Sequence, residues 1–178
     1  MARASPHIPA HGRLELAQQV SALRARLLRG TSGPTVPASL VTPWELLRLA
    51  AIGDGTLGCV LVRLLAEEED GTLRVPAEPA RQLQMVEVAL QRLGASHRAS
   101  DLVVRAPDGR LVWLLPRADR SMVDGLGQRL APLLDGSRFW HQDAYLRLRA
   151  EVGRTIVQAR SIADLATLCH AAERQPLC

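Results

Sequence analysis

Apolar residues recur along the chain with two periods, one typical of helices and one typical of strands. Residues 13–29 have the helical period, with a seam of two heptads formed by Leu16, Val20, Leu23 and Leu27. Two heptads are too few for an autonomous coiled coil, so this helix either pairs two protomers or docks on the sheet of its own domain. Residues 1–12 are predicted to be a disordered lead, residues 13–37 a helix with a linker, and residues 38–178 one folded domain.

The first half of that domain predicts a helix, a strand and a second helix. Thr42 is placed to cap the first helix, with Pro43 at its first position and Glu45 closing a capping box. Residues 58–65 are almost continuously apolar, as in a central strand covered on both faces. A helix over 78–94 follows, and its predicted inward face is Leu83, Val86, Leu90 and Leu93.

The second half predicts a hairpin, a helix, a strand and a last helix. The hairpin covers 101–116 around Pro107-Asp108-Gly109, which has turn chemistry, and a helix over 120–134 follows it. Residues 144–158 alternate as one strand, or as two strands with a break at Gly153, and a capping box at 161–164 opens the last helix. This order of elements indicates the mixed α/β (α+β) class, a central sheet with helices on its faces.

Composition fits one small core with an appendage. The chain has 178 residues, 47% of them hydrophobic, and only five aromatics, so aliphatic side chains must fill the core. All 22 basic residues are Arg, and the net charge of +4 favours an anionic partner. The first residues contain no apolar leader and no stretch is long enough to cross a membrane, so we expect a cytoplasmic, bacterial protein.

Several kinds of chemistry are disfavoured by the spacing of residues. The three cysteines, Cys59, Cys169 and Cys178, make no CxxC pair and no metal-ligand spacing, and no nucleophilic triad is evident, so we expect no catalytic residues, metal or cofactor. The arginines are scattered, and no RNA- or DNA-binding motif occurs, so we expect no nucleic-acid partner. Phe139, Trp140 and Tyr145, near Arg138, could stack bases, but we interpret them as core or edge residues near a hairpin.

The tetrapeptide Arg98-Ala-Ser-Asp101 stands at the entry of the predicted hairpin. An Arg fork donates two hydrogen bonds to O6 and N7 of guanine, and a carboxylate three residues later accepts from the N1–H and N2–H edge. The alternative is a solvated ion pair that contributes little.

The order of motifs around this tetrapeptide resembles the C-terminal half of a GGDEF domain, the diguanylate cyclase family. A helix at 86–93 leads into the RxxD motif at 98–101, a strand, a turn, a second strand that ends near Pro116, and a helix with Gly127-Gln128-Arg129-Leu130. The match covers roughly residues 40–175 and is specific around 86–134. The resemblance implies that Arg98, Asp101 and, from the following helix, Arg129 bind cyclic di-GMP, usually as an intercalated dimer.

The chain departs from the family pattern where catalysis would occur. The signature positions are residues 107–111, and the acidic ones hold Gly109 and Arg110. Joining two GTP molecules needs carboxylates that hold Mg²⁺, and the strand at 59–66, where the family has its first metal-binding Asp, contains none. The acidic run 67–70 is either a set of displaced metal ligands or a solvated loop, and we interpret it as the loop.

The resemblance therefore implies a receptor for cyclic di-GMP that is not an enzyme. It would relay the ligand to a protein effector, for example in exopolysaccharide or cellulose synthesis, in biofilm formation or in motility control, and a homodimer is one form in which it would act. The alternative is a ligand-independent interaction or dimerisation scaffold derived from a decayed cyclase domain. Residual cyclase activity through the 67–70 carboxylates is a third reading.

Overall fold

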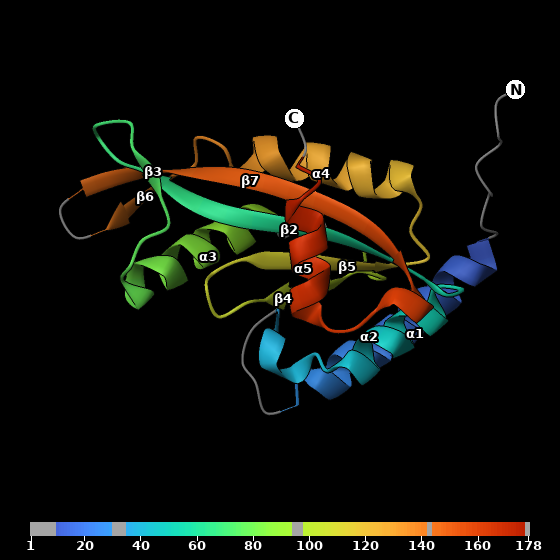
Figure 1. Cartoon of the computed structure of the whole chain (residues 1–178). Coiled ribbons are helices and arrows are strands. Elements are labelled where there is room, and N and C mark those ends of the chain that lie inside the picture. Colours follow the sequence, from blue (N-terminus) through green and yellow to red (C-terminus); the bar gives the residue numbers. More distant parts are fainter. Residues whose placement is uncertain (1–9, 30–34, 94–97, 142–143, 177–178) are drawn as a thin grey trace, which may run out of the picture.

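The computed structural model describes residues 10–29, 35–93, 98–141 and 144–176, and its centre is one curled sheet (Figure 1). The sheet has seven strands in the order β1-β4-β5-β2-β7-β6, with β3 attached to β2. Only β1 and β4 run parallel; the other pairs are antiparallel. The strands are β1 (Val36–Pro37), β2 (Thr56–Glu67), β3 (Leu73–Arg74), β4 (Leu102–Arg105), β5 (Leu111–Pro116), β6 (Arg138–His141) and β7 (Ala144–Gln158).

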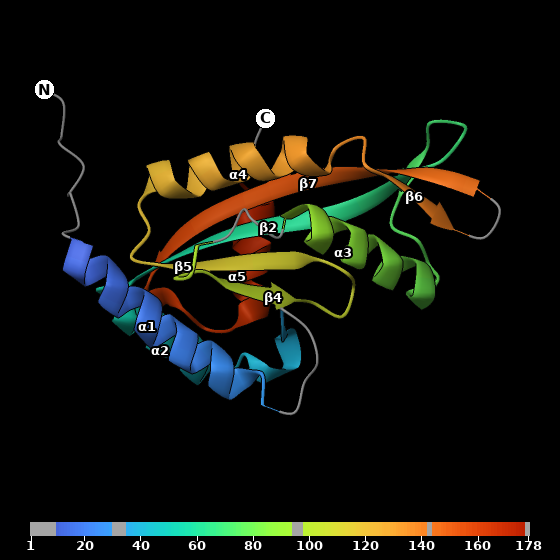
Figure 2. The ribbon, with the colours of Figure 1, turned by 180° about the vertical axis from the view of Figure 1, so that it is seen from behind.

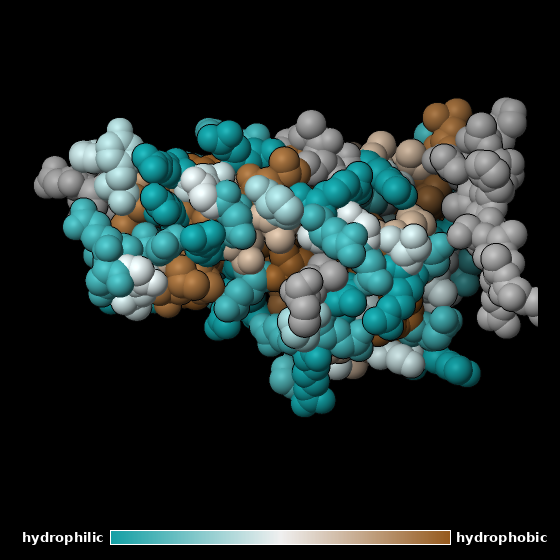
Figure 3. Space-filling view, turned by 90° about the horizontal axis from the view of Figure 1, so that it is seen from above, coloured by the Kyte–Doolittle hydropathy of each residue, from teal (hydrophilic) through white to brown (hydrophobic). Residues whose placement is uncertain are grey.

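Helices cover both faces of this sheet. On one face, α3 (Pro79–Leu93) and α4 (Arg120–Leu134) pack side by side (Figure 2). On the other face lie α1 (Ala10–Leu27), α2 (Pro43–Ile52) and α5 (Leu165–Glu173) (Figure 1). The predicted α+β class, a central sheet flanked by helices, is confirmed. Figure 3 shows the molecule from above, where hydrophilic side chains predominate and apolar ones form scattered small patches.

Strand β2 is the centre of the fold, because it pairs with β5 on one side and with β7 on the other. Val60, Val62 and Leu64 are buried under α3 and α4, and Leu57, Cys59 and Leu61 are buried on the opposite face. This confirms the prediction of a central strand, which extends beyond 58–65 at both ends. Gly58 is required here, since a Cβ atom would lie 2.6 Å from Cβ of Ala118.

The N-terminal helix docks on its own domain. Leu16, Val20 and Leu23 are buried in the core cluster that also contains residues of α2 and of the sheet, so α1 packs through the predicted seam. The Thr42 hydroxyl caps α2, as predicted, and accepts from the Glu45 N–H at 3.3 Å. The Glu45 carboxylate, however, pairs with Arg26 of α1, so it ties the two helices together.

Five local predictions were wrong. The predicted disordered lead, residues 1–12, overlaps α1, which begins at Ala10. Leu83 is 47% exposed, because the buried stripe of α3 is centred on Met85, Val86 and Ala89 and Leu83 lies outside it. The last helix begins at Leu165, since residues 159–161 form a 3₁₀ turn and Asp164 is the cap, accepting from the Thr167 N–H at 2.7 Å.

The other two errors concern strands that the sequence analysis did not predict. Part of the predicted linker forms β1, where Val36 is buried and opposite Val104 in β4. Strand β6 was also missed; it pairs with the start of β7, which is one continuous strand through Gly153. Among the described residues, no helix has the length and apolar character needed to cross a membrane.

Candidate functional site

The RxxD motif forms a closed turn at the entry of β4. The Asp101 N–H donates to the Arg98 carbonyl at 3.0 Å, and the Arg98 N–H donates to Oδ2 of Asp101 at 2.9 Å. Asp101 thus closes the turn with both its backbone and its side chain, which is a common task for aspartate at turns. The turn directly precedes Leu102, a fully buried residue, and is therefore anchored to the sheet.

The two predicted guanine ligands differ sharply in exposure. Asp101 is only 3% exposed, whereas Arg98 is exposed. Within the described residues the Arg98 guanidinium makes no hydrogen bond or ion pair. The turn therefore presents the arginine fork to solvent and keeps the carboxylate inside.

Arg129 lies on α4, which covers the same face of the sheet as α3, the helix that precedes the RxxD turn (Figure 2). It is exposed, and its Nε donates to the Gly125 carbonyl one helical turn earlier at 3.2 Å. Gly125 and Gly127 do not interrupt α4. Among the described residues, no hydrogen bond or ion pair joins the Arg98 and Arg129 side chains.

The turn between β4 and β5 contains residues 107–109, which the resemblance places among the signature positions of the family. Gly109 has φ +79°, and Asp108 Oδ1 accepts from the Arg110 N–H at 3.2 Å, so Asp108 shapes the turn as predicted. The Arg110 guanidinium is ion-paired, with Nε 2.7 Å from Asp108 Oδ2 and Nη1 2.5 Å from Glu173 Oε1 of α5. Arg110 is therefore a cation whose charge is engaged by carboxylates of the turn and of α5.

The acidic run 67–70 is largely engaged in local structure. Glu67 accepts from Nε of Arg149 at 2.7 Å, and Asp70 accepts from the Thr72 N–H at 2.9 Å. Glu68 pairs with Arg74 and Arg81, and the hydrogen bond from Arg74 holds the pKa of Glu68 below its ordinary value.

The run lies beyond the part of β2 that pairs with β5. Leu111, which follows the β4–β5 turn, is opposite Val62 in β2, and Glu67 stands five residues further along the same strand. Across the ranges that the structure describes, no three His, Cys, Asp or Glu side chains come together as a metal site would need.

The described cysteines are buried thiols. Burial raises the pKa of Cys169 to about 11 and that of Cys59 well above its ordinary value. Both thiols are therefore protonated at neutral pH, and nucleophilic chemistry requires the thiolate. Cys178 lies outside the described residues.

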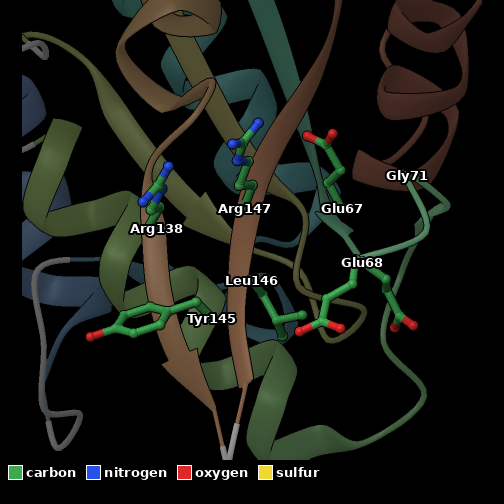
Figure 4. Close-up of a pocket in the computed structure, with 8 residues that line it drawn as sticks. Glu67, Glu68, Gly71, Arg138, Tyr145, Leu146 and Arg147 are labelled. Carbon is green, nitrogen blue, oxygen red and sulfur yellow. The ribbon is translucent and has the colours of Figure 1, made fainter.

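Sequence reasoning missed a polar cavity beside the β6–β7 hairpin. It has a volume of about 390 Å³ and is shown in Figure 4. Its lining residues are Glu67, Glu68, Glu69, Gly71, Arg138, Tyr145, Leu146 and Arg147. The alternation of residues 144–158 was visible in the sequence, but the pairing of this strand with β6, which brings Arg138 to the cavity, was not.

Comparison with known proteins identifies the fold. No family model and no curated protein matches the sequence. The coiled coil and GGDEF domain of DgcB from Caulobacter crescentus, solved in complex with c-di-GMP, matches 93% of this chain and 88% of its own, with TM-score 0.58 and 14% identity. The GGDEF domain of FimX from Pseudomonas aeruginosa matches 79% of this chain and 85% of its own, with TM-score 0.51 and 12% identity.

A third solved structure is diguanylate cyclase SiaD from Pseudomonas aeruginosa in complex with its activator SiaC. It matches 90% of this chain and 59% of the SiaD chain, with TM-score 0.57 and 12% identity. At these identities the likeness shows the fold. The chain has a GGDEF-like fold, and its chemistry must be argued from its own residues.

Proposed function

We propose that this protein is a receptor for cyclic di-GMP that lacks cyclase activity and passes the binding event to a protein effector. The observation that supports it best is the contrast between two turns of one GGDEF-like sheet. At the RxxD turn, Arg98 is exposed and unpaired within the described residues. At the β4–β5 turn, Arg110 stands in place of an acid and is engaged by Asp108 and Glu173.

Recognition in this proposal depends on arginine forks. The Arg98 guanidinium donates to O6 and N7 of one guanine, and Arg129, on this protomer or a neighbouring one, supplies a second fork. An intercalated ligand dimer carries four phosphate charges, which the net charge of +4 attracts. In this proposal, Asp101 accepts from the N1–H and N2–H edge of the guanine. Because Asp101 is 3% exposed, this contact requires the adjoining chain to move aside.

Two solved neighbours support this assignment. The structure of the DgcB domain is a complex with c-di-GMP, and that of SiaD is a complex with an activator protein. By analogy, ligand binding here shifts an existing equilibrium between assemblies, and an effector of exopolysaccharide synthesis or motility reads the shift. The proposal assigns no chemical step to the chain.

The absence of cyclase activity has its own test. Purified protein incubated with GTP and Mg²⁺ is expected to form no cyclic di-GMP, because Gly109 and Arg110 supply no carboxylate for the metal ions. The product is measured by chromatography against an active cyclase as positive control. Mg²⁺-dependent product that disappears when Glu67, Glu68 and Asp70 are replaced by their amides would support the residual-cyclase reading instead.

The binding site is tested by charge-matched variants. Arg98→Ala is expected to weaken binding of fluorescent cyclic di-GMP about 5- to 150-fold, the range for loss of one bidentate guanine contact. Arg48→Ala removes an exposed arginine from α2, which lies on the face of the sheet opposite α4, and should leave the affinity unchanged. Equal affinities for both variants would show that binding, if present, does not use the RxxD turn.

The burial of Asp101 favours a second candidate function. A carboxylate that is 3% exposed and already caps its own turn is what a purely structural RxxD motif would show. In that case the chain is a ligand-independent interaction scaffold. The Asp101→Asn variant distinguishes the receptor from the scaffold. Its amide oxygen still accepts from the Arg98 N–H, but the amide cannot accept from both the N1–H and the N2–H of guanine. A receptor loses affinity in this variant; a scaffold shows no binding in either form.

A further inference from the structure

The β6–β7 hairpin has a buried face and an exposed face. Phe139 and Leu146 point into the core under α3 and α4. Arg138, Trp140, Tyr145 and Arg147 are all exposed on the other side, and we call these four side chains the hairpin face. Gln84 of α3 donates a hydrogen bond to the Trp140 carbonyl, so the hairpin is held against the domain.

Two like charges stand directly opposite each other on the hairpin face. Arg138 is the cross-strand neighbour of Arg147, and Figure 4 shows their guanidinium groups on the same side of the hairpin. Such pairs repel and destabilise a sheet. In the described part of the chain, neither guanidinium has a hydrogen bond or an ion pair. A counter-charge from outside the hairpin would remove this repulsion.

The natural intramolecular partner of Arg147 is already engaged. Glu67 is directly opposite Arg147 on the β2 side, but its carboxylate accepts from Nε of Arg149 at 2.7 Å. The row across β6, β7 and β2 therefore contains two unneutralised arginines. Strand register places the two arginines next to each other.

Aromatic side chains extend the hairpin face toward its tip. The rings of Trp140 and Tyr145 meet edge to face with centroids 4.5 Å apart, and the residues are 49% and 65% exposed. Trp, Tyr and Arg are the residues that contribute most to binding at protein interfaces, and charged partners give such interfaces their specificity. The composition therefore favours a protein partner that brings acidic side chains.

Acidic side chains of this kind lie on the same surface. Glu69 lines the same 390 Å³ cavity as Arg138 and Arg147. Glu69 and Asp70 are exposed, and within the described residues Glu69 has no ion pair. One patch thus presents two arginines and two carboxylates, and among the described residues no ion pair joins the arginines to the carboxylates. A two-fold axis would place the arginines of one copy on the carboxylates of the other, as isologous interfaces require.

We propose that the hairpin face and the adjacent Glu69–Asp70 loop form an isologous interface with a second copy of this chain. Arg138 and Arg147 of one protomer pair with the acidic loop of its partner, and the Trp140–Tyr145 pairs pack near the axis. The proposal is independent of cyclic di-GMP, because none of these residues belongs to the RxxD turn or to α4.

The test uses two single charge reversals, Arg147→Glu and Glu69→Arg. Sedimentation velocity of the wild-type chain is expected to show a monomer–dimer equilibrium at about 0.2 mM protein that weakens with added salt. Each variant alone places like charges across the axis and should raise the dimer Kd at least about tenfold. Arg160→Glu, a reversal at an exposed site in the 159–161 turn, is the control and should dimerise like the wild type.

Mixing the two variants gives the decisive result. In a heterodimer of the Arg147→Glu and Glu69→Arg variants, position 147 of each protomer again faces a position 69 of opposite charge. The equimolar mixture should therefore form dimers that neither variant forms alone. Arg138→Glu serves as a second reversal if thermal melting shows that Arg147→Glu is unfolded. A wild-type chain that stays monomeric at about 0.2 mM, or a mixture that remains monomeric, overturns the proposal. An acidic foreign protein would then be the occupant to seek.

Discussion

Asp101 has a structural role that can be separated from any role in ligand binding. Its Oδ2 accepts from the Arg98 N–H at 2.9 Å, and the residue is 3% exposed. Arg98, its partner in the motif, is exposed and contributes only its backbone to the turn. Substitutions at the two ends of the motif should therefore differ in their effect on folding.

We predict that Asp101→Ala lowers the free energy of unfolding by about 1–3 kcal/mol, because it leaves a hydrogen-bond donor without its acceptor. Asp101→Asn keeps the acceptor and should lose less. Arg98→Ala should change stability by less than about 0.5 kcal/mol. Urea denaturation of the three variants measures these differences, and a loss for Arg98→Ala as large as that for Asp101→Ala would show that the arginine side chain also holds the turn.

The buried thiols give a second prediction at the residue scale. Because burial raises the pKa of Cys59 and Cys169, both should react slowly with a thiol reagent at pH 8 in the folded protein and quickly in urea. Cys178→Ser removes the remaining thiol, so that only these two are counted. Rapid labelling of the native variant would contradict the burial of both side chains.

Single elements were predictable where they are long and strongly patterned. The apolar run of β2, the hairpin around Asp108 and the heptad seam of α1 are local signals, and each was found where it was expected. Strands β1 and β6 are short, and they exist because β4 and β7 lie beside them, which no local pattern shows. The sequence also left open what α1 packs against; the contacts with α2 and the sheet resolve it.

The same limit applies to the candidate sites. The RxxD turn was found because its four residues are consecutive, whereas the burial of Asp101 depends on how the chain around it packs. The pairing of Arg138 with Arg147 depends on strand register, and the engagement of Glu67 by Arg149 depends on residues 82 positions apart. Spacing in the sequence contains no information about either.

The docking of α1 makes a prediction with an internal control. Leu23 is 4% exposed and Leu14, on the same helix, is 60% exposed. Leu23→Ala should lower the free energy of unfolding by about 2–4 kcal/mol, since it leaves a cavity in the core, whereas Leu14→Ala should cost less than about 0.5 kcal/mol. Equal effects, measured by thermal or urea unfolding, would mean that α1 does not pack through this seam in solution.

At the scale of the whole molecule, the two proposed surfaces occupy different places on the sheet. The RxxD turn opens β4, and α4 with Arg129 covers the face shared with α3. The hairpin face stands at the other end of the sheet, where β6 and β7 project beyond the helices (Figure 1). A ligand site and an association site separated in this way can be altered independently.

The most direct test of the receptor proposal is a calorimetric titration of cyclic di-GMP into the wild-type protein, with GTP as the control ligand. We predict saturable binding with a micromolar or tighter Kd, close to two ligand molecules per site, and no comparable binding of GTP. An exposed arginine fork and a ligand that binds as an intercalated dimer account for both results. No heat at high ligand concentration would contradict the receptor function and leave the interaction scaffold as the function of this GGDEF-like domain.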